Sequence, residues 1–226
     1  MKLAVIIPCR NEEAILGTLI PRLSALRDNA RILFVDGGSS DRTIDVLERA
    51  GERVVKSPRG GRAFQMNFGA SQTDAEVLFF LHCDSIPPPD AVSEIREVLR
   101  IHDAGCFGIR FDRDTLPYRF GAMMSNRRVV KKKIMFGDQG IFLKREVFNA
   151  VGGFPELPLM EDYALSQRLL DCGFTCGLAN SRIVTSARRF ETGGMIRTVL
   201  LMKRLQRMYL RGDDIERIAA LYRQKR

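Results

Sequence analysis

The sequence predicts an α/β protein with a mostly parallel, doubly wound central sheet in one domain and a helical extension at the C-terminus. Short apolar runs alternate with helix-like periodicity through the first half of the chain, which is typical of parallel strands joined by helical crossovers. The chain has 226 residues, of which 45% are hydrophobic and 28% are charged. This is ordinary globular composition at the size of one domain, so a fibrous or disordered chain is excluded.

The expected strands and helices follow one another in regular order. Pro21 is expected to kink the first helix, and Ser40 and Asp41 to start the second. Strands are expected where apolar runs have strand length, at residues 3–8, 31–36, 52–56, 76–81, 105–111 and 141–144. Helices are expected at residues 12–27, 40–50, 62–71 and 89–102, from 161 onward, and at 195–211.

The positive charge is concentrated at the end of the chain. We expect the domain to cover residues 1–190 and the basic helical extension to cover 191–226. The net charge is +9. Residues 182–226 hold 12 Lys or Arg and 4 Asp or Glu, so eight of the nine net positive charges lie there. The body is therefore nearly neutral.

Targeting signals and cysteine pairs are both missing. The apolar stretch at residues 3–7 is shorter than the core of a signal peptide, and no apolar run approaches the ~20 residues of a membrane span. The protein is therefore expected in the cytosol. The five cysteines are scattered without a Cys-x-x-Cys pair, so neither a disulfide framework nor a structural zinc site is expected. Cys172 and Cys176 are interpreted as buried thiols.

Polar clusters follow three of the predicted strands, at residues 8–13, 36–41 and 82–85. Because the carboxyl ends of parallel strands meet at one edge of a sheet, where α/β proteins bind ligands, we expect these clusters to form one site. Asp41 has an alternative role as a cap of the helix that follows it.

Two common nucleotide-binding loops are absent. No Gly-x-Gly-x-x-Gly follows the first strand, and the chain has no Gly-x-x-x-x-Gly-Lys-Ser/Thr. The Gly-rich turn at residues 59–62 has two open interpretations. It contacts a diphosphate through backbone N–H groups and a guanidinium, or it is a solvated turn.

Four segments, in this order, resemble the family 2 glycosyltransferases, which have the GT-A fold. They read VIIPCRNEE at residues 5–13, VDGGSSD at 35–41, FLHCD at 80–84 and EDYALSQRL at 161–169. The resemblance extends over roughly residues 3–190. More narrowly, the chain resembles the short bacterial branch of radical-SAM/selenodomain-associated transferases. The resemblance implies transfer of a sugar from a nucleotide-diphosphate sugar, UDP-linked in preference to GDP-linked, to an acceptor hydroxyl.

The resemblance also implies where the donor binds, with a donor half at residues 1–112 and an acceptor half at 113–190. The segment that lines the nucleoside pocket contains Glu12, and the turn that contacts the base opens with Asp36. The family has a basic residue near the nucleotide, and Arg62, in preference to Arg59, falls at that position. The alternative for Arg62 is equally open: a surface arginine at the start of a helix. The implied donor-binding residues are Pro8, Arg10, Glu12, Asp36, Gly38, Arg62, His82, Asp84 and Gln139.

The metal-binding motif of the family is altered in this chain. The Asp-x-Asp that holds Mn²⁺ or Mg²⁺ against the diphosphate reads His82-Cys83-Asp84. The resemblance therefore leaves Asp84 as the metal ligand, and Mg²⁺ sites commonly use only one or two carboxylates. His82 either makes the ribose or sugar contact that the missing Asp makes in the family, or it only packs against its neighbours in the fold. Asp84 has the alternative of capping the Pro-rich turn at residues 86–89.

The catalytic residues are implied at the start of the helix that begins at residue 161. The resemblance makes Asp162 the general base that takes the proton of the acceptor hydroxyl during transfer with inversion, and Glu161 its neighbour, which positions it or raises its pKa. Two acids at a helix N-terminus also interact favourably with the helix dipole, and this alternative does not exclude the first. The segment at 137–140, which contains Gln139, resembles the part of the family that lines the sugar and the acceptor.

Two basic segments suggest a partner. Residues 195–211 combine an apolar stripe with an arc of Arg and Lys, and residues 127–133 form a second basic run. Either suits an anionic membrane surface or a lipid-linked or phosphorylated acceptor, while the alternative is an apolar stripe that packs on the protein's own core. The chain has no Trp, four Tyr and no recognition motif, so nucleic acid is not an expected partner.

The resulting hypothesis is a metal-assisted inverting glycosyltransferase, cytoplasmic or peripheral at the inner face of the membrane. Two alternatives stay open. A catalytically inert module that binds a nucleotide-sugar or a membrane surface would account for His82 and the basic end of the chain. A nucleotidyltransferase would use a related sheet, but the Gly-rich loop that such enzymes have after the first strand is absent.

Overall fold

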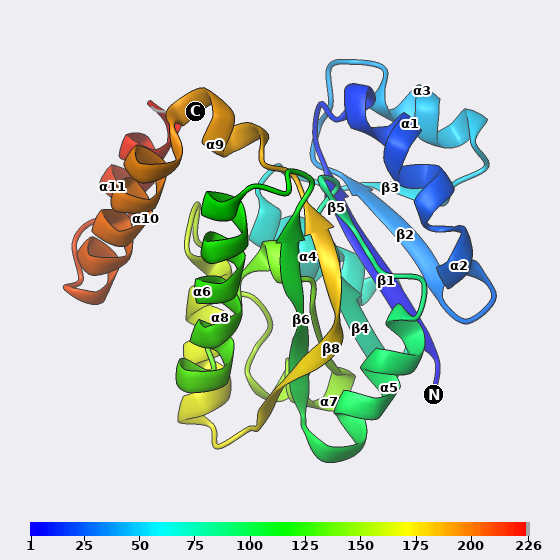
Figure 1. Ribbon diagram of the computed structural model, residues 1–226. Coiled ribbons are helices and arrows are strands. Elements are labelled where there is room, and N and C mark those ends of the chain that lie inside the picture. The colour runs from blue at the N-terminus through cyan, green and yellow to red at the C-terminus, as the bar shows by residue number, and fades with distance from the viewer. Residues whose placement is uncertain (225–226) are drawn as a thin grey trace.

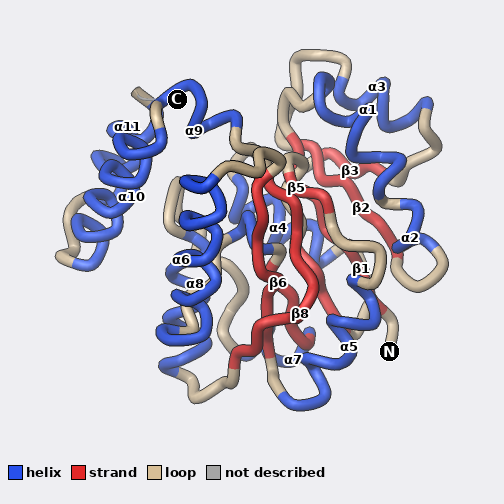
Figure 2. The backbone as a smooth tube through the Cα atoms, in the orientation of Figure 1, coloured by secondary structure: helices blue, strands red, loops and turns tan. Residues whose placement is uncertain are grey.

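The protein has an eight-stranded sheet between two layers of helices, as Figures 1 and 2 show for the computed structural model. The structure describes residues 1–224, apart from the side chains of residues 189 and 192, so the last two residues of the expected extension lie outside it. The strands are β1 (Leu3–Cys9), β2 (Arg31–Asp36), β3 (Val54–Lys56), β4 (Val77–Phe80), β5 (Ser85–Ile86), β6 (Ala104–Phe111), β7 (Ile141–Lys144) and β8 (Cys176–Thr185).

The order of the strands is β3-β2-β1-β4-β7-β6-β8-β5. The pairs of β1 with β2, β1 with β4, β2 with β3, and β6 with β8 are parallel, which confirms the mostly parallel sheet. One expectation was wrong. The sequence pattern placed β6 as the next parallel strand of the first half, but β7 lies between β4 and β6 and is antiparallel to both.

The helices confirm the expected ranges to within a few residues at most ends. The first expected helix is broken rather than kinked: Pro21 lies in its last turn, and the chain leaves the helix at Leu23 before one further turn forms. The helices are α1 (Glu13–Arg22), α2 (Ser24–Arg27), α3 (Thr43–Arg49), α4 (Arg62–Ser71), α5 (Ala91–Ile101), α6 (Leu116–Lys132), a 3₁₀ turn η1 (Gly137–Gln139), α7 (Arg145–Ala150), α8 (Glu161–Asp171), α9 (Arg188–Gly193), α10 (Met195–Leu210) and α11 (Ile215–Arg223).

Successive strand residues contribute to opposite faces of the sheet, so each face has its own apolar core. In β1, Val5 and Ile7 belong to the core under α1, α2, α3 and α5, while Ile6 belongs to the core under α4, α7 and α8. Phe79 and Phe80 divide in the same way in β4. Burying each of these side chains contributes about 1.5–3 kcal/mol.

The C-terminal helices pack on the body through a separate apolar cluster. Leu205 and Met208 of α10 are buried together with Leu159 and Met160, which lie just before α8, and Tyr163 packs against them. The alternative in which the apolar stripe of residues 195–211 packs on the protein is therefore confirmed. In the described residues, no helix is both long and apolar enough to cross a membrane.

The five cysteines are free thiols in the structure. Cys176 is buried in β8, but Cys172 is exposed just after the end of α8, so the interpretation of Cys172 as a buried thiol was wrong. The apolar face of α8 ends at Leu169, and the chain turns to the surface there.

Candidate active site

The carboxyl ends of β1 and β2 meet at one edge of the sheet, and a buried glutamine of α4 holds them together. The Nε2 of Gln65 donates hydrogen bonds to the carbonyl oxygens of Cys9 at 2.9 Å and Val35 at 2.7 Å. A Cβ at Gly37 would lie 2.6 Å from the Gln65 amide, so only glycine fits there. Sequence reasoning missed Gln65, because a buried glutamine within a helix belongs to no motif.

The loops after β1 and β2 are tied to each other. Asn11, at a φ of 56°, accepts a hydrogen bond from the backbone N–H of Ser40 at 2.8 Å, and its own N–H donates to Ser39 Oγ at 2.9 Å. The N–H of Glu12 donates to Thr43 Oγ1 at 2.8 Å. The segment that contains Pro8, Arg10 and Glu12 is therefore fixed against the turn that Asp36 opens.

Asp36 organises that turn. Its carboxylate is 2% exposed and accepts hydrogen bonds from the N–H groups of Gly38 at 2.9 Å and Ser39 at 3.1 Å. The φ of Gly38 is +86°, a conformation that favours glycine. A contact of Asp36 with a base stays a prediction. Asp41 lies just before α3, whose N-cap residue is Arg42, and its carboxylate accepts from the N–H of Thr43, the first residue of that helix, at 3.0 Å.

The Gly-rich turn before α4 lies against both strand-end loops. A Cβ at Gly60 would lie 3.1 Å from the carbonyl oxygen of Gly37 and 3.2 Å from a guanidinium nitrogen of Arg10. Arg59 is engaged by Glu156 in an ion pair and stacks over the ring of Phe64 at 4.0 Å. Arg62 is also in an ion pair, with Glu161, so the choice between the two arginines stays a prediction.

Arg62 joins α4 to the start of α8. Its guanidinium lies 3.2 Å from a carboxylate oxygen of Glu161, whose side chain is 4% exposed. Burial lowers the pKa of Arg62, but the negative charge of Glu161, with smaller effects from Tyr222, Asp162 and Asp84, raises it by more. Burial raises the pKa of Glu161, and Arg62 opposes that shift. The two predicted residues Arg62 and Glu161 therefore form one charged pair.

His82 and Asp84 follow β4 at the same edge. A Cβ at Gly137 would lie 2.3 Å from His82 Cε1, so η1 approaches the imidazole as closely as glycine allows. Burial and the positive charge of Arg62 lower the pKa of His82 to about 3, which makes the ring neutral at pH 7. Its Nε2 is buried and has no hydrogen-bond partner in the described part of the chain. Asp84 is exposed.

The start of α8 fixes the carboxylate of Asp162. The N–H of Gly137 donates to Asp162 Oδ2 at 2.8 Å, and the N–H of Tyr163 donates to Oδ1 at 2.7 Å. Each carboxylate oxygen has a second lone pair, so Asp162 can still accept a proton or a further hydrogen bond. The predicted base is therefore oriented by two backbone groups.

Asp138 is an acidic residue that the sequence analysis did not single out. Burial, with Asp162 and Asp84 adding to it, raises the pKa of Asp138 to about 6, although the nearby Arg128 acts in the opposite direction. Its Oδ1 is buried and has no partner among the described residues. The signal in the sequence was its position between Gly137 and Gly140, in the segment that resembles the sugar and acceptor lining of the family.

Arg128 of α6 was hidden in the basic run at residues 127–133. It donates to Gln139 Oε1 at 2.7 Å and lies 3.8 Å from the centre of the Phe136 ring. The expected direct contact of Gln139 with the donor needs correction. Gln139 has no exposed surface, its Oε1 also accepts from the N–H of Phe136 at 3.1 Å, and its Nε2 donates to Phe107 at 3.4 Å. The Gln139 side chain instead ties η1, of which it is the last residue, to Arg128, Phe136 and Phe107.

The residues present fit a divalent cation held by few protein ligands. In residues 1–224, no three His, Cys, Asp or Glu side chains lie close enough together to hold a metal by themselves. The exposed carboxylate of Asp84 and the unpartnered Oδ1 of Asp138 are hard oxygen donors at one edge, which is the chemistry that Mn²⁺ and Mg²⁺ prefer. A cation there would complete its coordination with ligand oxygens and water.

The chain is similar to several curated proteins at low identity. The chain is 24% identical over 191 residues to the beta-monoglucosyldiacylglycerol synthase of Synechocystis, covering 74% of this chain and 40% of that protein. It is 22% identical to the probable glycosyltransferase YdaM of Bacillus subtilis, covering 76% of this chain and 47% of that protein. It is 26% identical to the PGL/p-HBAD biosynthesis glycosyltransferase of Mycobacterium tuberculosis, covering 91% and 83%. The chain thus spans less than half the length of the first two relatives.

Solved structures of similar fold confirm the predicted GT-A fold. The mannosyltransferase PcManGT from Pyrobaculum calidifontis, in complex with GDP-Man and Mn²⁺, has a TM-score of 0.70 at 19% identity, covering 91% of this chain and 61% of that one. Glucosyl-3-phosphoglycerate synthase from Mycobacterium tuberculosis, in complex with Mn²⁺, UDP and phosphoglyceric acid, has a TM-score of 0.63 at 18% identity, covering 81% and 70%. The narrower bacterial branch stays a prediction. The sequence model of the family described as "Glycosyl transferase family 2" matches residues 4–154, more than half of the chain, so the protein belongs to this family.

Proposed function

We propose that the protein is an inverting glycosyltransferase that moves a sugar from a nucleotide-diphosphate sugar to an acceptor hydroxyl. The observation that carries the proposal is the position of Gly137, whose N–H donates to Asp162 at 2.8 Å and whose Cα lies against the ring of His82. Asp162 is thereby held beside Asp138, the residue after Gly137, and near the turn that contains Asp84. The sheet up to residue 112 would hold the donor, residues 113–190 the acceptor, and the extension from 191 onward would support α8.

Asp162 is the general base in this proposal. The backbone N–H groups of Gly137 and Tyr163 hold its carboxylate in one orientation, which suits a group that must meet an acceptor hydroxyl in line with the sugar. Asp162 takes the proton of that hydroxyl as its oxygen attacks the anomeric carbon. The nucleoside diphosphate leaves from the opposite side of the anomeric carbon, so the configuration at that carbon inverts.

Glu161 acts on the reaction through Arg62. Because Glu161 is engaged by Arg62, it does not compete with Asp162 for the acceptor proton. Its role is to hold the guanidinium at the edge of the sheet, where a positive charge stabilises the diphosphate as negative charge develops on it. The neutral ring of His82 lies against Gly137 at the same edge of the sheet.

A divalent cation would be held by Asp84, with Asp138 beside it. When bound, Mn²⁺ or Mg²⁺ supplies positive charge that neutralises the diphosphate of the donor and makes it a better leaving group. Two of the similar solved structures were determined with Mn²⁺.

The donor is proposed to be a UDP-sugar in preference to a GDP-sugar. Among the structures of similar fold, TarS of S. aureus was solved with UDP-GlcNAc and PcManGT with GDP-Man, so both nucleotides occur on this fold. We propose a cytoplasmic location, peripheral at the inner face of the membrane, with a lipid-linked acceptor. The name of the synthase from Synechocystis, which contains diacylglycerol, supports a lipid acceptor.

The experiment that tests the proposal is nucleotide release from a panel of UDP- and GDP-sugars by the purified protein with Mn²⁺. We expect release from at least one donor, and its loss in Asp84→Ala and Asp162→Asn. Removing a general base lowers the rate about 10²–10⁴-fold. Asp171→Asn is a matched control for Asp162→Asn, since Asp171 is exposed at the other end of α8.

Three outcomes would contradict the proposal. Unchanged nucleotide release in both active-site variants would refute the assignment of the site. Donor binding without any turnover would favour an inert binding module. Release of pyrophosphate in place of the nucleoside diphosphate would favour nucleotidyl transfer.

A further inference from the structure

Helix α6 exposes large apolar side chains along its first half. Leu116 is 79% exposed, Phe120 62%, Met123 46% and Met124 51%. The opposite side of α6 is buried on the sheet, where Ala122 and Val129 pack. Side chains of this size normally leave water on folding, so a group of them on one helix face indicates a surface that binds something apolar.

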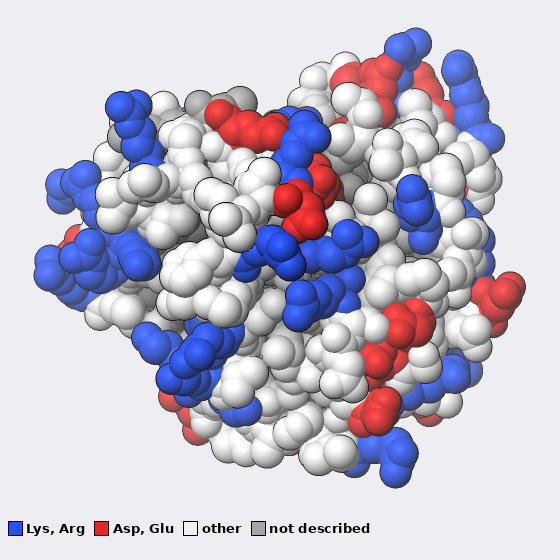
Figure 3. All heavy atoms as spheres, viewed as in Figure 1, with Lys and Arg blue, Asp and Glu red and all other residues white. Residues whose placement is uncertain are grey.

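The start of α10 lies beside this part of α6. A Cβ at Gly121 would lie 3.1 Å from Met195 Cε, and in the preceding helix α9 the ring of Phe190 lies 6.3 Å from that of Tyr118. In α10, Ile196 is 76% exposed and Leu200 58% exposed. Figure 3 shows uncharged surface over α6 and α10 with groups of Lys and Arg around it.

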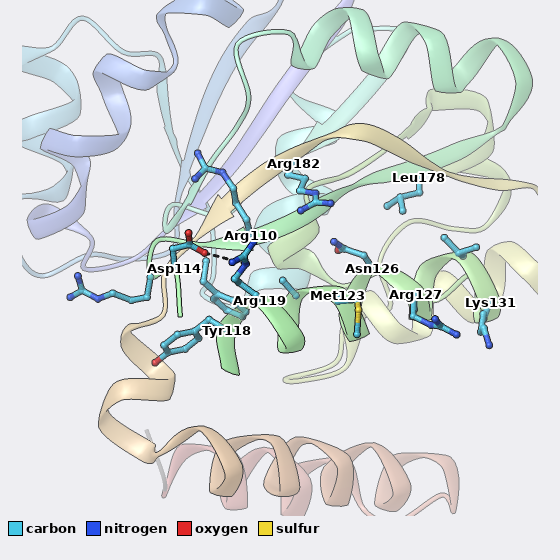
Figure 4. A pocket seen from close by; sticks show the side chains of 14 residues that line it. Arg110, Asp114, Tyr118, Arg119, Met123, Asn126, Arg127, Lys131, Leu178 and Arg182 are labelled. Carbon is cyan, nitrogen blue, oxygen red and sulfur yellow. Dashed lines mark ion pairs between the residues drawn. The ribbon is translucent and has the colours of Figure 1, made fainter. Parts of the chain in front are cut away.

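A basic groove runs along the other flank of α6. It has a volume of about 710 Å³ and lies between α6 and the strands β6 and β8 (Figure 4). Its cations include Arg110 and Arg182 from the strands and Arg127 and Lys131 from α6. Within the described residues, no ion pair or hydrogen bond engages these four side chains, in contrast to Arg119, which lies 3.6 Å from Asp114. The groove therefore has positive charge without a partner.

We infer that this face binds the surface of a membrane that contains anionic phospholipid. The apolar side chains of α6 and α10 would enter the boundary between headgroups and acyl chains, and the groove cations would contact lipid phosphates. The inference deepens the proposed function, because it rests on the peripheral location proposed above and names the surface responsible. It also selects between the two segments that the sequence analysis named. The sequence pointed to two segments, residues 195–211 and 127–133, and the apolar stripe of the first packs on Leu159 and Met160. The inferred surface therefore centres on α6, which contains most of the second.

The test is flotation of the full-length protein with vesicles of phosphatidylcholine alone and of phosphatidylcholine with phosphatidylglycerol, at low and high salt. Wild type is expected to bind the anionic vesicles and to bind the neutral ones far more weakly. Each Lys or Arg near an anionic surface contributes about fivefold, so the double variant Arg127→Gln/Lys131→Gln is expected to bind anionic vesicles roughly 25-fold more weakly. Leu116→Ser/Phe120→Ser is expected to lose the binding that persists at high salt, where charge is screened.

Helix α5, on the opposite face of the sheet, offers matched controls. Ile101 is 77% exposed there, and Arg96 and Arg100 are exposed on the same helix. Ile101→Ser and Arg96→Gln/Arg100→Gln make the same chemical changes away from the inferred surface, and both are expected to bind vesicles like wild type.

Donor binding by calorimetry, without vesicles, keeps this inference separate from the proposed function. The α6 variants are expected to bind donor like wild type, which also shows that they are folded. The inference is overturned if wild type binds neither kind of vesicle, if it binds both equally, or if the α5 variants lose as much binding as the α6 variants. Loss of donor binding by wild type would count against the proposed function alone.

Discussion

At the scale of single residues, Asp138 shows how an environment changes the chemistry of a side chain. Its ordinary pKa is 3.8, and burial beside Asp162 and Asp84 raises it to about 6 in the folded protein. Between these two values the folded state holds a proton that the unfolded chain has lost. The stability that this proton contributes is complete below about pH 4 and is lost as the pH rises through about 6.

Asp138→Asn removes this titration. We expect the stability of the variant, relative to wild type, to rise between these two pH values by on the order of 1–3 kcal/mol. Urea unfolding of both proteins at a series of pH values measures the difference. The lowered pKa of His82 makes the protein less stable as the pH falls over a similar range, which is the opposite effect. Because His82 is present in both proteins, its contribution cancels from the difference in stability. A difference that stays constant with pH would contradict the prediction.

The candidate residues that could be named from the sequence are those that lie in segments resembling the family. Asp84 follows a strand and Asp162 lies in the first turn of a helix, within segments that resemble the family, so both could be named from the sequence, and their roles stay predictions. Gln65 and Arg128 could not be found in this way. Their importance comes from neighbours far away in the chain, such as Cys9 for Gln65, and no local pattern records those contacts.

At the scale of secondary-structure elements, the pair of Arg62 and Glu161 couples α4 to α8. Removing Arg62 leaves a carboxylate that is 4% exposed without its partner, whereas the Arg62 side chain is itself 38% exposed. We therefore expect Arg62→Gln to destabilise the protein by about 1–3 kcal/mol, less than for a fully buried pair.

A double-mutant cycle measures this coupling by urea unfolding. Arg62→Gln/Glu161→Gln is expected to be more stable than the sum of the single variants implies. The exposed pair of Lys2 and Asp74, at 3.1 Å with 65% and 64% exposed side chains, is the control, and its coupling should lie within about 1 kcal/mol of zero. Equal coupling in the two pairs would contradict the role given to Arg62.

Helix α10 is expected to stabilise the start of α8. Leu205 is fully buried in the cluster that contains Met160, the residue directly before Glu161. Leu205→Ala is expected to cost about 2–5 kcal/mol, and to lower turnover because the start of α8 loses its support. Thermal unfolding and nucleotide release measure the two effects. Leu210→Ala, at a position that is 57% exposed on the same helix, should change neither.

Most elements could be predicted because their signals are local. The sequence predicted the bounds of β2, α4 and β7 as the structure has them, since the apolar runs and the helix start signals lie within those segments. The break between α1 and α2 was expected as a kink. Its exact position depends on how Leu23 and Leu26 pack in the core, which a single proline does not determine.

At the scale of the whole molecule, the proposed metal site needs ligand oxygens in addition to protein ones. Because the described side chains form no metal site of three or more residues, Mn²⁺ alone is expected to bind weakly. Mn²⁺ and UDP together should raise the unfolding temperature by more than the sum of their separate effects. Thermal unfolding with each ligand alone, with both, and with both after chelation measures this. A full shift with Mn²⁺ alone would contradict the proposal.

The order of the strands could be predicted only in part. Helical crossovers correctly indicated that β1, β2, β3 and β4 are parallel neighbours. They could not reveal that β7 inserts between β4 and β6, because that pairing joins residues more than 60 positions apart in the chain, such as Phe79 and Phe142. The choice depends on how Phe79, Phe107 and Phe142 fit together in the core.

The reversed direction of β7 has a consequence for how this protein could change its specificity. A strand parallel to β4 would begin at the far edge of the sheet, but β7 begins where β4 ends, so the turn at Gly137–Gln139 is delivered beside His82. The segment that leads into β7 comes from α6, and its hydrogen bonds hold it to Ser166 and Asp162 of α8 and to Phe107 of β6. Insertions or exchanges between α6 and η1 could therefore alter the sugar and acceptor side while the nucleotide side keeps its geometry.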